Sequence, residues 1–435
     1  MQNIQEKNNP FLIMLFPLIF TLIPSPSSSG LQSLIFPAIG AILLFIGLKW
    51  YLNANLNQGI LYVLAMLFIY ALTIALSITF SSNIKAGDFF QIAKPFYFGI
   101  ILLFGFFVAR LNDEKSIIKG LLTVAYLMIF AQLVTGITQL LDIPLFDFIY
   151  SDEKSRPFGR MMRLVGTTGN PNTFGWLVIQ SAVIITLFET RSLRKWLWIA
   201  IVTMLLVFSG SRSMLIMLPI IIIGASLIAT RKNIKFYIFK VPIYICLLAL
   251  SYFSLIWFLE KYQTSFPYLS QLLTVLNGEG IDSINSVELR TVAWDSALLN
   301  FSQNSGLSTW LFGLGAGTYP VMDNTYYYSI INTGYVGLAT VLALFLMLIF
   351  IFKKVKNIKI KALGYQYIIF SLALGIQADT ISGWTYPAFA LFYAGIAIAI
   401  VEKQKNTSAQ GEVYVPHVKE KVKRQRKRYR IVWSK

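Results

Sequence analysis

Residues 58–80 read QGILYVLAMLFIYALTIALSITF and contain no charged side chain. A helix of roughly 20 such residues is long enough to cross about 30 Å of hydrocarbon. A helix packed in a soluble core would show a polar stripe at every third or fourth position, and this stretch has none. The stretch therefore predicts a membrane-spanning helix.

Similar apolar blocks recur along the whole chain of 435 residues, which is 56% hydrophobic and only 13% charged. Soluble proteins usually carry about a quarter charged residues. The pattern predicts an all-α polytopic membrane protein with about twelve transmembrane helices. The predicted spans are 10–25, 31–49, 58–80, 95–110, 117–140, 173–189, 195–209, 213–229, 236–258, 329–352, 363–379 and 384–401.

The first span resembles a signal peptide, but it lacks a small-x-small cleavage site and is expected to be a retained anchor. Basic residues set the orientation, because cytoplasmic loops carry an excess of Lys and Arg. With the N-terminus inside, the inner segments hold 28 of the 37 Lys and Arg residues. Both termini are therefore predicted to be cytoplasmic. Residues 1–402 form the predicted transmembrane domain, with long outer loops at 141–172 and 259–328.

The formal net charge of +18 is concentrated in the predicted cytoplasmic tail, residues 403–435. Such a tail suits the anionic lipid headgroups of the inner leaflet, so membrane lipid is the expected partner and nucleic acid is not. The single cysteine, Cys246, lies in an apolar block, and the single histidine, His417, lies in the tail. These counts exclude a disulfide framework and a histidine-based metal site or triad. No metal and no cofactor are expected.

The first long outer segment ends in RMMRLVGTTGNPN, residues 160–172, just before a predicted helix. Asn172 or Thr173 is predicted to cap that helix, whose positive dipole end then lies near the outer surface. Helix N-termini beside arginines suit phosphate groups. A plain capped turn with two interfacial arginines is the simpler explanation of these residues, and the phosphate site is the alternative.

A short outer connection holds Ser211-Arg212-Ser213 between two apolar helices. An arginine held this tightly between spans needs a partner. The alternative is that it extends to the outer headgroups.

The second long loop carries three features, ELRTVAW at 288–294, WLFGLGAGTY at 310–319 and DNTYYY at 323–328. The first predicts a helical segment. The glycine run is followed by no GK[ST] and lies in no βαβ unit, so a flexible turn is expected rather than a nucleotide site. The tyrosines suit an interfacial belt. Asp323, at the start of the tenth span, is also placed to act as a base or to orient a sugar hydroxyl.

Taken together, these features put Arg163, Arg212, Arg290 and Asp323 on one side of the membrane. These motifs, in this order over roughly 155–340, resemble the O-antigen ligase and Wzy-type polymerase superfamily. The resemblance rests on RLVG at 163–166, GNPN at 169–172, the Ser-Arg-Ser element, the arginine–tryptophan helix at 290–294 and the glycine turn. The DN-x-Y start of the tenth span and the following Gly334 and Gly337 complete it.

The resemblance implies a C-type-like membrane glycosyltransferase of the bacterial cell (inner) membrane. Such enzymes take undecaprenyl-diphosphate-linked glycans on the outer face, without a metal. Arg163, Arg212 and Arg290 would neutralise the departing diphosphate, and Asp323 would act as base. The same resemblance implies that five further residues bind the substrate, namely Arg160, Asn170, Asn172, Asn324 and Tyr326. A flippase and a chain-length regulator are the partners that the resemblance implies.

One departure separates the branches of this superfamily. Ligases usually place a histidine before the asparagine of the last motif, where this chain has Asp323. The aspartate favours a polymerase that makes capsular polysaccharide, exopolysaccharide or O-antigen, with a ligase as the nearest alternative. A transporter or flippase is a further alternative. It is disfavoured by the absence of an internal repeat and by spans with almost no charge beyond Lys240. A purely structural scaffold leaves the outward arginines unexplained.

Overall fold

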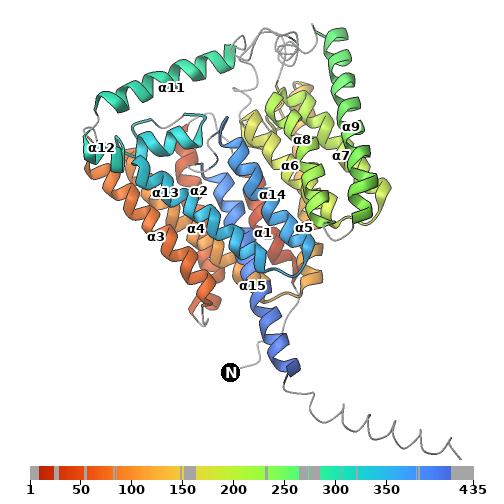
Figure 1. Cartoon of the computed structure of the whole chain (residues 1–435), viewed down its shortest axis with the longest axis horizontal. Coiled ribbons are helices and arrows are strands. Elements are labelled where there is room, and N and C mark those ends of the chain that lie inside the picture. The colour runs from red at the N-terminus through yellow and green to blue at the C-terminus, as the bar shows by residue number, and fades with distance from the viewer. Residues whose placement is uncertain are drawn as a thin grey trace, which may run out of the picture.

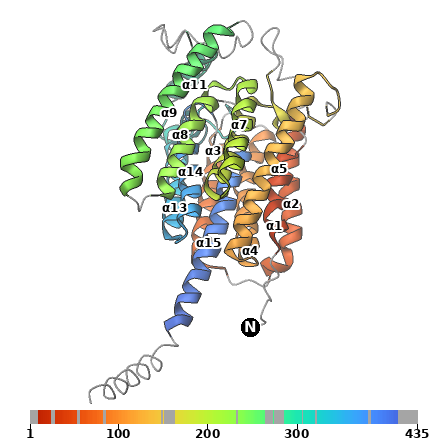
Figure 2. The same ribbon diagram turned by 90° about the vertical axis from the view of Figure 1, so that its right-hand side faces the viewer.

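The computed structural model of the chain is helical over nearly all of the residues that it describes (Figures 1 and 2). Those residues are 9–23, 29–52, 56–81, 84, 86–146, 149–150, 163–230, 234–263, 273, 285–304, 306–319, 322–378, 380 and 383–412. Within the body, the helices run side by side, and α11 lies across one end of it (Figure 1).

The first nine helices are α1 (Pro10–Thr21), α2 (Ser29–Leu52), α3 (Gln58–Thr79), α4 (Ala86–Arg110), α5 (Glu114–Leu140), α6 (Pro171–Phe188), α7 (Ser192–Ser209), α8 (Arg212–Ala229) and α9 (Ile234–Lys261). The later helices are α11 (Asn285–Gln303), α12 (Leu307–Phe312), α13 (Thr325–Lys354), α14 (Ile358–Leu374) and α15 (Thr385–Glu412).

Eight helices in the described part of the chain are long and apolar enough to cross a membrane, which is the composition of a polytopic membrane protein. They are α3, α4, α5, α6, α7, α8, α13 and α15, while α1 and residues 35–48 of α2 are shorter apolar helices. Each of the twelve predicted spans overlaps one helix of the structure. The count of twelve crossings nevertheless stays a prediction, because eight helices of the described part have the length and composition of a membrane span.

Two predicted boundaries are wrong by about two turns or more. The fourth span was expected to begin at residue 95, but α4 begins at Ala86, so Asp88 and Lys94 lie within a helix. The last span was expected to end at residue 401, but α15 continues to Glu412. Its C-terminal part extends beyond the other helices (Figures 1 and 2). Both errors arise because charged residues near a helix end lower the local hydropathy without ending the helix.

The centre of the body is a tight crossing of α4 and α15. A Cβ atom on Gly105 would lie 2.4 Å from the carbonyl oxygen of Phe392, and one on Gly395 would lie 2.2 Å from that of Leu102. Both helices are therefore in backbone contact. Small residues permit such close packing where no hydrophobic effect drives two helices together.

The bundle has two ends that differ in composition. At one end the start of α5 and the α13–α14 turn meet α15 near Lys403, since Asn357 donates to Glu114 and Lys403 Nζ donates to the Asn112 carbonyl. At the other end the starts of α6, α8 and α13 lie with the end of α14 and with α11 (Figure 1). All the predicted site residues that the structure describes belong to this second end, here called the site end.

Candidate functional site

The segment 163–170 enters the body between α1, α5 and α7 as irregular backbone with one 3-10 turn, Gly166–Thr168. Non-helical backbone at membrane depth is tolerated only where protein groups satisfy its N–H and C=O groups. Two buried glutamines on α5 provide this: Gln139 accepts from the Gly166 N–H at 2.9 Å and donates to its carbonyl at 3.0 Å. Gln132 does the same for Thr167, accepting from its N–H at 3.0 Å and donating to its hydroxyl at 2.7 Å.

Gly166 is required in this segment. Its φ of 55° is left-handed, and a Cβ there would lie 2.0 Å from the Gln132 side-chain oxygen. A larger residue would therefore displace the glutamine that holds the segment.

Asn170, rather than Asn172 or Thr173, caps α6. Its Oδ1 accepts from the N–H groups of Asn172 at 2.8 Å and Thr173 at 3.3 Å. The prediction was wrong because Pro171 occupies the first helical position, where its fixed φ suits the helix and its missing N–H costs nothing. Asn172 is thereby released from capping, and its Oδ1 accepts a hydrogen bond of 2.9 Å from the Ser211 hydroxyl.

Arg163 binds the C-terminal end of α7. Its Nε donates to the Ser209 carbonyl at 3.1 Å and its Nη2 to the Gly210 carbonyl at 3.4 Å. A guanidinium at this position satisfies carbonyls that lack a helical partner and complements the negative end of the helix dipole. Arg212 is the first residue of α8 and follows the same turn directly.

These contacts define a first group, the α6–α8 cluster, made of Arg163, Asn170, Asn172, Ser211 and Arg212. The fifth predicted residue of this region, Arg160, lies outside the described residues.

A second group, the α11–α13 cluster, contains Arg290, Trp294, Asp323, Asn324 and Tyr326. Arg290 on α11 donates from Nε to Asp323 Oδ2 at 3.0 Å, and the two side chains are 27% and 43% exposed. Trp294, one turn further along α11, donates to the Met322 carbonyl. Asp323 has a φ of 46°, a left-handed conformation that is uncommon outside glycine. Strain of this kind clusters at functional sites.

Asn324 and Tyr326 fix the start of α13 to the end of α14. Asn324 Oδ1 caps α13 by accepting from the Tyr326 and Tyr327 N–H groups at 3.0 Å each, and its Nδ2 donates to the Ile376 carbonyl at 3.2 Å. The Tyr326 hydroxyl donates to the Leu372 carbonyl at 2.8 Å. Both side chains are therefore bonded to the protein and hold the start of α13 in place. Helix α14 also packs against α6 and α8 of the first cluster.

The glycine run packs against a break in α13. Gly334 has φ 69° and ψ −174° inside the helix, and a Cβ there would lie 2.3 Å from the Leu311 carbonyl. The freed Ile331 carbonyl accepts from the Leu314 N–H at 2.7 Å, and Asn332 exchanges two 3.0 Å hydrogen bonds with Tyr319. The sequence predicted a turn here; the packing of α13 explains why it contains several glycines.

Sequence reasoning missed two buried ionisable residues on α4. Asp88 is 2% exposed and lies against Gly317, while Lys94 is 8% exposed with its Nζ 5.4 Å from the Trp384 ring centroid. The expectation of nearly charge-free spans is therefore wrong for α4. Their charge was visible in the sequence, but it was assigned to an outer segment because the span was begun at residue 95. The Lys240 side chain lies outside the described side chains.

In chemical terms the site end offers guanidinium groups and, in Asp323, a partly exposed carboxylate that is paired with one of them. Within the described ranges no three His, Cys, Asp or Glu side chains gather as ligands for a metal ion. A scan against protein-family models and a search of the curated proteins found no match to this chain.

Proposed function

We propose that this protein polymerises undecaprenyl-diphosphate-linked oligosaccharide repeat units on the outer face of a bacterial cell membrane. The resemblance of residues 155–340 to the O-antigen ligase and Wzy-type polymerase superfamily suggested this activity. The observation that carries it here is the Arg290–Asp323 pair. A partly exposed carboxylate is held on strained backbone by an arginine, at the same end of the bundle as Arg163 and Arg212.

The proposed reaction is an inverting substitution at an anomeric carbon. An acceptor hydroxyl gives its proton to Asp323 while its oxygen bonds to C1 of the donor sugar, and the bond from C1 to the diphosphate oxygen breaks. The lipid diphosphate leaves with the electron pair. Arginines that are already in place stabilise this developing charge better than water, which would first have to reorganise.

The contacts support different tasks for the three arginines. Arg290 touches the proposed base, so it both orients Asp323 and presents positive charge beside the reacting centre. Arg163 is bound to two carbonyls of the turn that precedes Arg212, so its first task is to hold that turn. Arg212, at the positive end of α8, is then the cation of the α6–α8 cluster that suits a phosphate best.

A flippase or transporter for the same lipid-linked sugar is the second candidate. Buried ionisable residues within spans and interrupted helices are features of transporters. Asp88, Lys94 and the break at Gly334 supply both features. They do not account for the partly exposed Arg290–Asp323 pair, so transport ranks second.

The test is to express Arg212→Ala, Arg290→Ala and Asp323→Asn in a strain that lacks the native gene, and to size the lipid-linked glycans. Arg191→Ala is the matched control, because Arg191 is an exposed arginine at the opposite end of α6. Polymerase activity predicts that single repeat units accumulate on the outer face in the three variants while the control makes long chains.

Other outcomes reject the proposal. Long chains that stay on the lipid would identify a ligase. Single units trapped on the inner face would identify a flippase, and Asp88→Asn, expressed beside the three variants, should then give the strongest effect. Normal chain length in all three variants would remove the residues from any catalytic role.

A further inference from the structure

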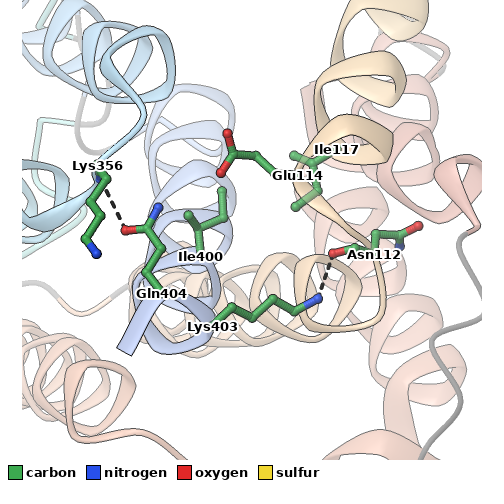
Figure 3. A pocket seen from close by; sticks show the side chains of 7 residues that line it. All are labelled: Asn112, Glu114, Ile117, Lys356, Ile400, Lys403 and Gln404. Carbon is green, nitrogen blue, oxygen red and sulfur yellow. Dashed lines mark hydrogen bonds between the residues drawn. The ribbon is translucent and has the colours of Figure 1, made fainter. Parts of the chain in front are cut away.

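The opposite end of the bundle carries a cavity that the proposed activity does not use. It has a volume of about 250 Å³ and is lined by Asn112, Glu114, Ile117, Lys356, Ile400, Lys403 and Gln404. Figure 3 shows these side chains around one space, contributed by the start of α5, the α13–α14 turn and residues 400–404 of α15. Three segments that are far apart in sequence therefore build it.

Both lysines of the cavity have hydrogen bonds to its other lining residues, Lys403 through its side chain and Lys356 through its backbone. Lys403 Nζ donates to the Asn112 carbonyl at 2.8 Å, and the Lys356 N–H donates to Gln404 Oε1 at 3.2 Å, as the dashed lines in Figure 3 show. The cavity therefore has one lysine whose ammonium group is held by a backbone carbonyl, Lys403, and one exposed lysine at its opening, Lys356. A cation that is held in place binds an anion at a lower entropic cost than a mobile surface lysine.

The carboxylates near the cavity also have partners. Glu114 accepts from Asn357 Nδ2, and Asp113 caps α5 through the Ser116 N–H. Glu402 is paired with Arg110 at 3.4 Å. The lining itself contains two lysines and one glutamate, a net charge of +1. That charge complements a singly charged phosphodiester better than a dianion.

Two further features point to a lipid. Ile117 and Ile400 form an apolar part of the wall, as the glycerol and acyl region of a phospholipid requires. Lys353, Lys354, Lys359 and Lys361 flank the same turn, and by the positive-inside rule this end faces the cytoplasm. The cytoplasmic leaflet is rich in anionic lipid.

We propose that this cavity binds the phosphodiester headgroup of an anionic phospholipid of the cytoplasmic leaflet. The bound lipid would join α5, the α13–α14 turn and α15 at the end opposite to the site. The inference is independent of the proposed glycosyltransferase activity, because it concerns the other end of the molecule and is measured by binding.

The experiment is native mass spectrometry of the purified full chain, titrated with phosphatidylglycerol or phosphatidylcholine. We expect one phosphatidylglycerol to bind with preference. Lys403→Gln and Lys356→Gln should each weaken it by about tenfold, the size of one lost charge-assisted hydrogen bond. Lys405→Gln, which removes the same charge from an exposed position of the same helix, should bind as the wild type does. Glu114→Gln keeps the acceptor for Asn357 and should bind more tightly.

The proposal is overturned if both pocket variants bind phosphatidylglycerol like Lys405→Gln, or if Glu114→Gln binds it more weakly. Inorganic phosphate at millimolar concentration provides the second arm. If it displaces the lipid, the cavity is a site for a soluble anion and the lipid assignment is wrong. Thermal unfolding of each variant shows that the compared proteins are folded.

Discussion

The two clusters at the site end use their arginines in different ways. In the α6–α8 cluster Arg163 donates to two backbone carbonyls, so its guanidinium is part of the structure that places Arg212. In the α11–α13 cluster Arg290 donates to a carboxylate that is 43% exposed. An arginine bound to backbone contributes to folding, whereas one bound to an exposed acid contributes little to it. Equal loss of activity in the two clusters would therefore have different causes.

Arg290→Ala is expected to give the largest functional effect. Loss of a fixed cation beside a developing negative charge reduces turnover by about a hundredfold or more. The free energy of unfolding should change by less than about 1 kcal/mol, because the lost ion pair is partly exposed. Polymer yield and the thermal unfolding midpoint of the same purified samples measure both quantities. A large drop in the midpoint would show that the contrast between the clusters is false.

Arg163→Ala should reduce polymer and stability together. Hydrogen bonds from a charged donor contribute about 1.5–3 kcal/mol each, so the loss of two lowers the unfolding midpoint clearly. Arg163→Lys keeps the charge but cannot reproduce both contacts, and it should recover only part of the midpoint. If activity per folded molecule is normal in Arg163→Ala, the residue is purely structural. If the unfolding midpoint is unchanged, the contacts of Arg163 to α7 do not contribute to stability.

Two substitutions of Asn170 distinguish the effect of helix capping from the effect of charge in the α6–α8 cluster. Asn170→Ala removes the cap of α6 and should cost about 1 kcal/mol of stability. Asn170→Asp still caps the helix, so its unfolding midpoint should match the wild type. It also adds a negative charge where a diphosphate is proposed to bind, and polymer should fall several-fold. Wild-type polymer in the aspartate variant would argue that no anion approaches this helix end.

The smallest effect concerns Glu189, at the opposite end of α6. Its substitution should change the stability of the protein but not its polymerase activity. Burial raises the pKa of its carboxyl, but hydrogen bonds from Tyr126, the Arg191 N–H and Arg194 outweigh burial and lower the pKa to about 2 from the ordinary 4.5. A carboxyl with a lowered folded-state pKa stabilises the protein fully above pH 4.5. This contribution is lost as the pH falls toward 2.

Glu189→Gln should accordingly melt a few degrees below the wild type at pH 7. The difference should shrink as the pH is lowered from 5 toward 2, in thermal melts of the two detergent-solubilised proteins. Polymer made per folded molecule at pH 7 should equal that of the wild type. A melting difference that is constant with pH would show that the carboxylate charge is not what stabilises this end.

Much of the architecture was predictable because uncharged blocks of about 20 apolar residues indicate membrane-spanning helices. Charged residues near the helix ends were the exception. Asp88 and Lys94 looked like loop residues, yet they lie in α4, because burial against Gly317 and Trp384 is a tertiary effect that hydropathy does not contain. The length of α15 was missed for a related reason, since a helix continues into water without any apolar signal.

The candidate site was predictable at the level of which residues share one end of the bundle, but not at the level of their tasks. Nothing in the sequence indicated that Arg163 binds the α7 carbonyls, or that Gln132 and Gln139 hold the segment before α6. The Asn-Pro-Asn order could have identified Asn170 as the cap, because proline favours the first helical position. The pairing of Arg290 with Asp323 spans a long loop and required the structure.

The central claim is that the α11–α13 cluster drives departure of a lipid diphosphate. Its most direct test uses the purified protein in nanodiscs. The substrate is lipid-linked repeat units extracted from a strain that cannot polymerise them, and the measured quantity is the release of polyprenyl diphosphate. We predict that the wild type and Arg191→Ala release one lipid diphosphate for each new linkage, and that Arg290→Ala releases about a hundredfold less at an unchanged unfolding midpoint. Equal release by Arg290→Ala and Arg191→Ala would contradict the account.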